Sequence, residues 1–367
     1  MRIKDDRTLS LYHRAGDDPD AVVARLVDRV PEQDGTYPYL ATAASLLSVA
    51  AGWAYADEAA FGDVVARAGL SNAGYRLISV ENDAMFVDAA AYLVRSRCGR
   101  LAILCFRGTL PRNVIDWFAD ASVAPLPFRE LGNVHGGFYR NVIAVWPAIW
   151  EKMTEFLADG RLEALYISGH SLGGAMAALA GMTLRYDEEY AAARPLLRGV
   201  YTFGQPMVAE PGLATECERD LGTIVFRHVY EHDLVPRLPP LSAGRFKHFG
   251  REYGARPSGL GWEERSTAVS QALSALVSLP IGAGAWVLRQ LALTRWLNLP
   301  FSWDDHSPVH YVRVSQNAPG VPMPSMKHVR YSAPAGPVAG ATRPGPPEPT
   351  VNGDRLQAPE PNGGSPL

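Results

Sequence analysis

Short apolar runs alternate with longer stretches of helical character along most of the chain. The apolar runs predict β-strands near residues 75–80, 89–95, 101–106, 164–168, 199–203 and 224–230. Helices are predicted at 21–30, 40–55, 138–157 and 172–186. Strands and helices that alternate in this way are typical of an α/β fold, in which helices cover both faces of a mostly parallel central sheet.

The strand predicted at 164–168 runs directly into a G-x-S-x-G turn, which is followed by a run of small apolar residues. This pattern predicts a nucleophile elbow, in which a sharp turn from strand to helix raises a serine above the sheet. Gly169 and Gly173 suit the turn because larger side chains there would collide. The following helix N-terminus places partial positive charge beneath the reacting oxygen. Ser171 is therefore the predicted nucleophile.

A serine hydroxyl needs a base, and after an elbow of this kind the acid and the histidine follow the serine in the chain. Asp233 comes just after the strand predicted at 224–230, where open α/β sheets collect functional residues. Glu231 is the nearest alternative carboxylate. A structural turn aspartate before Pro236 is the other interpretation of Asp233. We predict Asp233 as the acid of the site.

Four histidines follow the predicted acid, namely His248, His306, His310 and His328. His328 falls in a proline-rich tail, and His248 has the apolar neighbours of a structural strand histidine. His306 lies in a loop after two aspartates, where an imidazole can reach the nucleophile. His310 lies inside a short terminal element. We therefore predict His306 as the base, with His310 as the alternative.

Four stretches of the chain together carry a family resemblance. They are residues 106–109 (Phe-Arg-Gly-Thr), 134–138 (Val-His-Gly-Gly-Phe), the nucleophile elbow, and 233–240 (Asp-Leu-Val-Pro-Arg-Leu-Pro-Pro). In this order they resemble the class 3 lipases, the α/β-hydrolase family of the fungal triacylglycerol lipases, over about residues 35–315. The resemblance implies an α/β-hydrolase fold and a lipase built on a serine, histidine and aspartate triad.

The resemblance also implies roles that residue spacing does not reveal. Thr109 would supply one oxyanion-hole donor and the backbone N–H of Leu172 the other, each worth roughly 10²-fold or more in rate. The stretch 110–120 would form a lid helix that closes over the serine, with Trp117 and Phe118 on its apolar side. A plain surface helix packed on the core is the alternative for this stretch.

Composition excludes some other classes of function. The chain of 367 residues has a formal net charge of −3, so it offers no basic field for nucleic acid. Its three cysteines are odd in number and lack the spacing of a zinc site or of a disulfide framework. We therefore expect no metal, and a triad of this kind needs no organic cofactor.

The ends of the chain differ from its centre. Residues 1–35 are predicted to be a polar extension without the apolar segment of a signal peptide, so a cytoplasmic protein, in solution or peripheral to a membrane, is expected. Residues 36–314 are predicted to form the lipase domain. In residues 315–367, 12 of the 29 prolines of the chain occur together with glycine and serine, which predicts a disordered tail.

An uncharged run at residues 266–288 separates the predicted acid from the predicted base. It is long enough to span a bilayer, but one crossing would place acid and base on opposite sides, and two crossings would need roughly 40 apolar residues. We instead predict two helices, at about 262–279 and 283–297. They would form an apolar helical cap, residues 262–300, inserted before the catalytic histidine.

Half of the tryptophans of the chain occur in or beside this cap, namely Trp262, Trp286, Trp296 and Trp303. Tryptophan is enriched where proteins meet lipid, so the cap is predicted to contact a membrane or lipid-droplet surface. The alternative is an insertion that only packs on the core.

The predicted activity is that of a serine carboxylic-ester hydrolase of lipase type, which cleaves acylglycerols or other fatty acyl esters through an acyl-enzyme. The expected partner is therefore a lipid or ester substrate. A phospholipase A1 and a soluble short-chain esterase are the alternatives among enzymes. A non-catalytic lipid-binding scaffold is the alternative from another class.

Overall fold

The computed structural model describes residues 10–12, 20–32, 37–82, 87–108, 124–239, 246–266, 304–319, 321 and 326–328. Contacts within the chain divide it into two units, residues 1–332 and 333–367. All described residues lie in the first unit.

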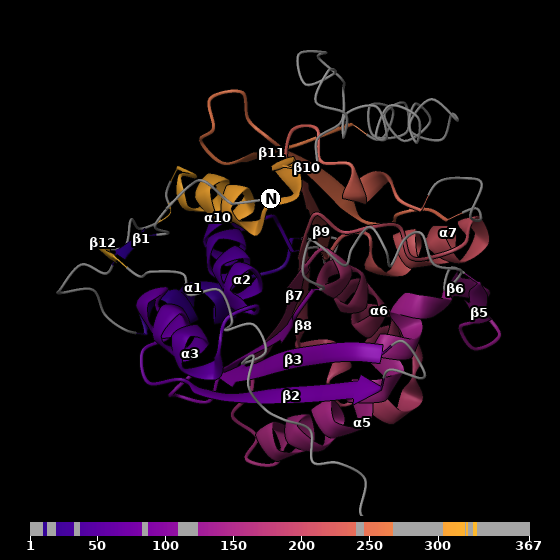
Figure 1. The fold of residues 1–367 in the computed structure, drawn as a ribbon. Helices are drawn as coiled ribbons and strands as arrows, with labels where there is room; N and C mark the ends of the chain where they lie inside the picture. Colours follow the sequence, from indigo (N-terminus) through magenta and orange to yellow (C-terminus); the bar gives the residue numbers. More distant parts are fainter. Residues whose placement is uncertain are drawn as a thin grey trace, which may run out of the picture. The chain divides into compact units, whose positions relative to one another are not determined.

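A sheet of eight strands, in the order β11-β10-β9-β8-β7-β4-β3-β2, forms the centre of the fold (Figure 1). The strands are β2 (Gly74–Asn82), β3 (Val87–Arg95), β4 (Leu101–Phe106), β7 (Ala164–His170), β8 (Leu197–Phe203), β9 (Val225–Val229), β10 (Arg251–Ala255) and β11 (Trp262–Glu264). The pairs from β4 to β10 are parallel, whereas β2, β3 and β11 are antiparallel to their neighbours. The predicted mostly parallel sheet is confirmed.

Helices cover both faces of this sheet. On one face lie α5 (Gly136–Leu157), α6 (Leu172–Tyr186) and α7 (Pro211–Leu221), and on the other lie α1 (Ala21–Val27), α2 (Ala41–Trp53), α3 (Glu58–Arg67) and α10 (Pro308–Gln316). Successive strand residues point to opposite faces, so Leu104 and Ile167 pack under α5 and α6 while Ile103 and Tyr166 pack under α2. β4 and β7 are buried along their whole length, which explains why their sequences are continuous apolar runs.

Short elements complete the described structure. They are the paired strands β1 (Ser10–Tyr12) and β12 (Met326–His328), the hairpin of β5 (Pro125–Pro127) and β6 (Asn133–His135), and the 3₁₀ turns η2 (Glu188–Tyr190), η3 (Arg194–Leu196), η4 (Val235–Arg237) and η7 (Asp304–His306). The end of α10 and β12 fall inside the stretch predicted as a disordered tail. Helix α1 packs into the core through Val23, Leu26 and Val27, although it belongs to the predicted polar extension.

The start of the predicted cap is wrong. Residues 262–264 form the edge strand β11 rather than a helix, because they pair with β10. Trp262 is buried, stacks on Tyr311 and donates from its indole N–H to Ser315 Oγ at 2.8 Å. It therefore belongs to the core and not to a lipid-facing surface. The rest of the cap, from residue 267 to 300, lies outside the described residues.

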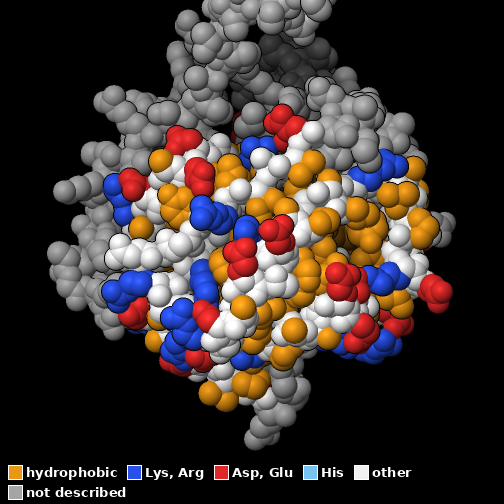
Figure 2. Space-filling view, turned by 90° about the horizontal axis from the view of Figure 1, so that it is seen from below, with side chains coloured by type: hydrophobic (Ala, Val, Ile, Leu, Met, Phe, Trp, Pro, Cys, Tyr) orange, Lys and Arg blue, Asp and Glu red, His pale blue; other side chains and the backbone are white. Residues whose placement is uncertain are grey.

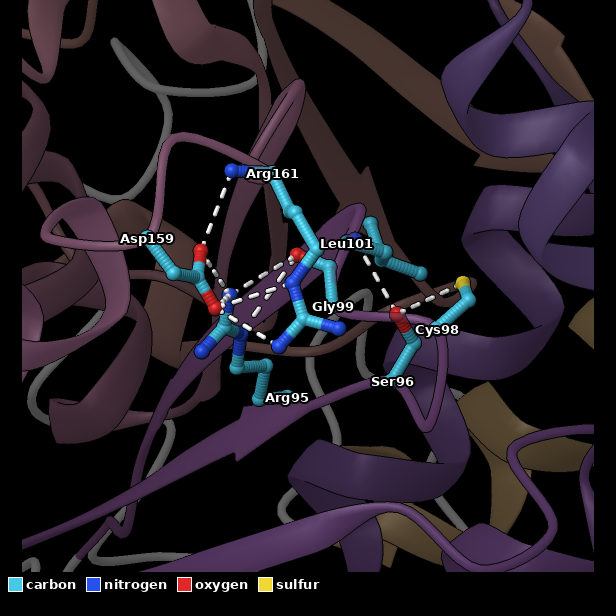
Figure 3. Close-up of polar contacts among 7 residues, drawn as sticks. All are labelled: Arg95, Ser96, Cys98, Gly99, Leu101, Asp159 and Arg161. Atoms are coloured by element: carbon cyan, nitrogen blue, oxygen red, sulfur yellow. Dashed lines mark hydrogen bonds and ion pairs between the residues drawn. The ribbon is translucent and has the colours of Figure 1, made fainter.

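The turn between β3 and β4 is fixed by polar contacts at the N-terminal end of β4 (Figure 3). Asp159 accepts hydrogen bonds from Arg95 at 2.6 Å and from Arg161 at 2.7 Å, and the bond from Arg95 is the main cause that lowers the pKa of Asp159. Ser96 Oγ accepts the N–H of Leu101 at 3.1 Å. The candidate nucleophile follows the C-terminal end of the neighbouring strand, so these contacts belong to the scaffold.

The surface shown in Figure 2 intersperses Lys and Arg with Asp and Glu, and hydrophobic side chains lie between them. This mixture agrees with the small net charge of the chain. Of the helices in the described ranges, none combines the length and the apolar character that crossing a bilayer requires.

Candidate active site

Ser171 lies at the turn between β7 and α6, at the C-terminal edge of the parallel strands. Its φ of 60° and ψ of −127° are unusual for a residue with a side chain. Such strain persists only where the surroundings impose it, and here the backbone N–H of Ser171 donates to Phe203 O on β8 at 2.9 Å. The predicted elbow is thus present as a strained turn held by the neighbouring strand.

Close backbone approaches explain both glycines of the elbow. A β-carbon on Gly169 would lie 2.1 Å from the carbonyl oxygen of Gly173. A β-carbon on Gly173 would lie 2.3 Å from the carbonyl oxygen of Phe106, at the end of β4. Neither distance is possible for real atoms, so only glycine lets α6 start this close to β7 and β4.

His306 connects the serine to the acid. Its Nε2 lies 2.7 Å from Ser171 Oγ and its Nδ1 lies 2.8 Å from Asp233 Oδ2. A carboxylate oxygen accepts, so Nδ1 carries the proton and Nε2 is left to accept from the serine hydroxyl. All three side chains are buried, although 135 residues separate the serine from the histidine. The structure therefore brings together the three residues predicted as nucleophile, acid and base.

The carboxylate of Asp233 accepts three hydrogen bonds from residues that the structure describes. Besides His306, the hydroxyl of Tyr311 donates to Oδ2 at 2.5 Å and the backbone N–H of Val235 donates to Oδ1 at 2.9 Å. Burial, and next the negative charge of Asp233, raise the pKa of Tyr311 well above its usual value, so its hydroxyl stays a donor. Tyr311 could not be predicted from the sequence, because an aromatic residue in an apolar segment carries no signal that separates it from the core.

Gly204, directly after β8, leaves room for the acid and the base. Its φ is +61°, and a β-carbon there would lie 2.9 Å from both Asp233 Oδ2 and His306 Cε1. Any larger residue would therefore displace the triad as well as strain the backbone. Gly204 was not among the predicted site residues, although a glycine at the end of a predicted strand was the available signal.

The alternative residues lie elsewhere. The ring of His310 stacks on Tyr230, with centroids 4.7 Å apart. His248 shares a hydrogen bond of 2.7 Å with the carbonyl oxygen of Pro236, which agrees with the structural role expected for it. Glu231 is exposed at the surface. None of these residues stands between Ser171 and the buried carboxylate.

One group of possible metal-ligating side chains occurs within the described ranges. It consists of Glu231, His232 and Asp305, whose ligand atoms lie within 4.8 Å of one another at the surface. The contacts of this group have a structural meaning, because the backbone N–H of His232 donates to Asp305 Oδ2 at 3.2 Å. This bond joins the turn that carries the acid to the turn that carries the base.

Of the two residues predicted for the oxyanion hole, Leu172 lies within the described residues. Leu172 is the first residue of α6, and the first N–H groups of a helix have no acceptor within it. The N–H of Leu172 is therefore available beside the nucleophile. Thr109 and the predicted lid residues Trp117 and Phe118 lie outside the described residues.

Comparison with known families agrees with this geometry. The sequence model of the class 3 lipases matches residues 103–243. This matching part of the chain belongs to the class 3 lipase family. The matched segment contains Ser171 and Asp233 but ends before His306, so the place of His306 beside them comes from the structure.

The alignments with known relatives cover about half of the chain. A lipase of Rhizomucor miehei is 30% identical over 171 residues, which are 46% of this chain and 46% of the relative. A triacylglycerol lipase of Arabidopsis thaliana is 28% identical over 205 residues, which are 45% of this chain and 39% of the relative. The chain thus spans about half or less of the length of these relatives.

A solved structure extends the likeness to the fold. The triacylglyceride lipase of Rhizomucor miehei superimposes with a TM-score of 0.54 and 22% identity, over 75% of this chain and 95% of that one. This likeness confirms the predicted α/β-hydrolase fold.

Proposed function

We propose that this class 3 lipase hydrolyses carboxylic esters of fatty acids through an acyl-enzyme intermediate. The observation that carries the proposal is the buried hydrogen-bonded series from Ser171 Oγ through His306 to Asp233. A serine positioned within 2.7 Å of an oriented imidazole is the arrangement that activates a hydroxyl for attack. The names of the relatives, lipase and triacylglycerol lipase, support the same class of reaction.

The proposed reaction has two halves. Ser171 Oγ forms a bond to the ester carbonyl carbon while its proton passes to His306 Nε2, and Asp233 holds the imidazole through Nδ1. The bond to the alkoxy oxygen then breaks, and His306 gives the proton to the leaving alcohol. Water repeats the sequence on the acyl-serine and releases the fatty acid. The N–H of Leu172, together with Thr109, would stabilise the oxyanion in both halves.

Acylglycerols are the proposed substrates, with phospholipids and short-chain esters as the competing ones. Turnover of p-nitrophenyl esters of rising chain length, a triglyceride emulsion and a phospholipid would separate these three. A lipase cleaves the emulsion, an esterase cleaves only the dissolved short esters, and a phospholipase A1 prefers the phospholipid. Ser171→Ala is the matched control, because alanine fits the elbow and removes only the reacting oxygen.

A separate experiment tests the alternative that this protein is a non-catalytic lipid-binding scaffold. A fluorophosphonate forms a covalent bond with an activated serine, so it should label the wild-type chain at Ser171 and leave Ser171→Ala unlabelled. Absence of labelling in folded wild-type protein, together with absence of turnover on every ester, would contradict the proposed function.

We also propose that residues 267–300 contact a lipid surface. The support is the uncharged sequence that contains Trp286 and Trp296. Replacing both with serine should weaken binding to liposomes and slow hydrolysis of emulsified ester, while a dissolved short ester is cleaved at nearly the wild-type rate. Trp262→Phe is the control, because Trp262 is a core residue whose loss should lower stability and affect both substrates alike. An equal loss on both substrates in the double variant would contradict the proposal.

A further inference from the structure

His170, the histidine inside the elbow motif, forms a hydrogen bond with the main chain of His306. His170 precedes Ser171, and its ring is buried under the site. Its Nε2 lies 2.9 Å from the backbone carbonyl oxygen of His306, and its Nδ1 lies 2.9 Å from the hydroxyl oxygen of Tyr55. Tyr55 follows closely after α2, so three separate parts of the chain meet at this ring.

The partners determine where the proton of His170 lies. A carbonyl oxygen only accepts, so Nε2 carries the hydrogen and donates to His306. Burial, and next the charge of His306, hold the pKa of His170 well below its usual value, so the ring is neutral. Nδ1 therefore accepts the hydrogen bond of the Tyr55 hydroxyl. The two bonds together allow one orientation of the ring.

The same pair contacts Gly108, two residues after the end of β4. A β-carbon on Gly108 would lie 2.2 Å from the hydroxyl oxygen of Tyr55 and 2.5 Å from the carbonyl oxygen of His170. Gly108 is thus packed directly against both members of the pair. The next residue is Thr109, to which the family resemblance gives an oxyanion-hole role.

The rings of His170 and His306 also face each other, with centroids 4.7 Å apart. His306 becomes positively charged during the proposed reaction. A second positive charge at this distance would oppose that step, whereas a neutral ring packs without this cost. The neutral form of His170 therefore suits both its hydrogen bonds and its position.

We propose that Tyr55 and His170 are positioning residues, which hold the main chain of His306 and the end of β4 at fixed places around Ser171. This proposal rests on the proposed function, because its consequence is the rate of acyl transfer. Neither residue reacts. Their effect is to keep the imidazole within hydrogen-bond reach of the serine, and misplacement of a catalytic group by about 1 Å can cost on the order of 10²-fold in rate.

A second tyrosine–histidine pair provides a matched control. His228 is also buried, its Nδ1 lies 3.0 Å from the carbonyl oxygen of Thr202, and its Nε2 lies 3.1 Å from the hydroxyl oxygen of Tyr39. Burial lowers the pKa of His228 to about 3, so this ring is neutral as well. The carbonyl that it holds belongs to a neighbouring strand and not to the triad.

The test compares variants that keep or remove the bond to the carbonyl. A Gln amide reaches the place of Nε2 and an Asn amide that of Nδ1, so His170→Gln keeps the donor to His306 and His170→Asn loses it. His228→Gln is the matched loss in the second pair, because there the donor is Nδ1. Tyr55→Phe and Tyr39→Phe remove the two hydroxyls. The measurements are kcat and KM on a dissolved p-nitrophenyl ester, the rate of fluorophosphonate labelling, and Tm.

We expect His170→Asn to lower kcat and the labelling rate about 10- to 100-fold at nearly constant KM. His170→Gln should recover most of this loss, and Tyr55→Phe should cost about fivefold, the worth of one hydrogen bond. His228→Gln and Tyr39→Phe should lower Tm but leave kcat within about twofold, because a bond lost away from the site acts on stability. If His170→Asn does not fold, the two tyrosine variants carry the comparison.

The proposal is overturned if His170→Gln and His170→Asn have equal kcat. It is also overturned if the variants of both pairs lose kcat in the same proportion to their loss of Tm. Tyr55→Phe equal to Tyr39→Phe in kcat would overturn it too. These outcomes require an active wild-type protein. An inactive and unlabelled wild type would instead contradict the proposed function.

Discussion

The pairs Tyr55–His170 and Tyr39–His228 have the same chemistry and different surroundings. Each contains a buried neutral imidazole that binds one tyrosine hydroxyl and one backbone carbonyl. In the first pair the carbonyl belongs to His306, 136 residues away. In the second it belongs to Thr202 on the adjacent strand β8. The type of contact is thus no guide to function, because what matters is which group the contact holds.

The largest effect is expected at His306, whose backbone carbonyl accepts the hydrogen bond of the first pair. His306→Ala should lower turnover of a dissolved ester by at least about 10³-fold, because triad members act as a unit. His310→Ala is the control, since His310 stacks on Tyr230 and should leave turnover near the wild-type value. Steady-state kinetics of the two variants decide the point. If His310→Ala were inactive and His306→Ala active, then His306 would not be the base and the first pair would have no role in turnover.

A smaller effect is expected at Gly204, which contacts His228 of the second pair as well as His306 and Asp233. The N–H of Gly204 donates to the carbonyl oxygen of His228 at 3.0 Å, while a β-carbon there would crowd His306 and Asp233. Gly204→Ala should lower kcat by roughly 10- to 100-fold through displacement of the imidazole. It should also lower Tm.

The control for this change is Gly160→Ala. Gly160 has a similar φ of +67°, but a β-carbon there would meet no atom within 4 Å. This variant should therefore show the backbone cost alone, about 1 kcal/mol in unfolding free energy, with unchanged kcat. Equal losses of kcat in the two variants would show that crowding of the triad is not the cause.

The smallest effect concerns the pH dependence of stability, which arises from the lowered pKa that His170 and His228 share. The folded pKa of His228, about 3, is below the unfolded value of about 6.5, so between these pH values the unfolded chain binds more protons than the folded one. Stability is then fully present above pH 6.5 and falls on acidification, by about 1.4 kcal/mol per pH unit for each such histidine. The lowered pKa of His170 has the same direction and the same consequence.

Replacing either histidine with glutamine should therefore reduce the slope of unfolding free energy against pH, below about pH 6, by about 1.4 kcal/mol per pH unit. Denaturant unfolding at several pH values from 6 to 4.5 measures this slope. Equal changes in His170→Gln and His228→Gln would show that the rings are equally neutral and differ only in what they hold. An unchanged slope in either variant would mean that its histidine is protonated in the folded state.

Local sequence patterns were sufficient for the central elements and for the candidate nucleophile. The strand predicted at 101–106 and the helix predicted at 172–186 have the bounds found in the structure, because a buried strand and a small-residue helix each need a continuous local pattern. The elbow is equally local, since strand, turn and helix are consecutive in the chain. Ser171 could therefore be named without knowledge of the fold.

Short elements at the edge of the sheet could not be predicted in this way. β10 and β11 have five and three residues, and β11 was mistaken for the start of a helix. Such strands depend on pairing with a neighbour, so their own residues carry little signal. Trp262 shows the consequence, because composition suggested a lipid-facing residue and the pairing of β11 places it in the core.

By itself, the sequence determined that this protein has a mostly parallel α/β sheet and a nucleophile elbow, and it supplied the candidate acid and base that follow in the chain. Only the tertiary structure decided which distant residues meet around Ser171. Tyr55, His170, Gly204 and Tyr311 come from four separate segments. The physical reason is that propensity acts over a few neighbouring residues, whereas these contacts arise from the order β4-β7-β8-β9 in the sheet, which places the ends of these strands side by side.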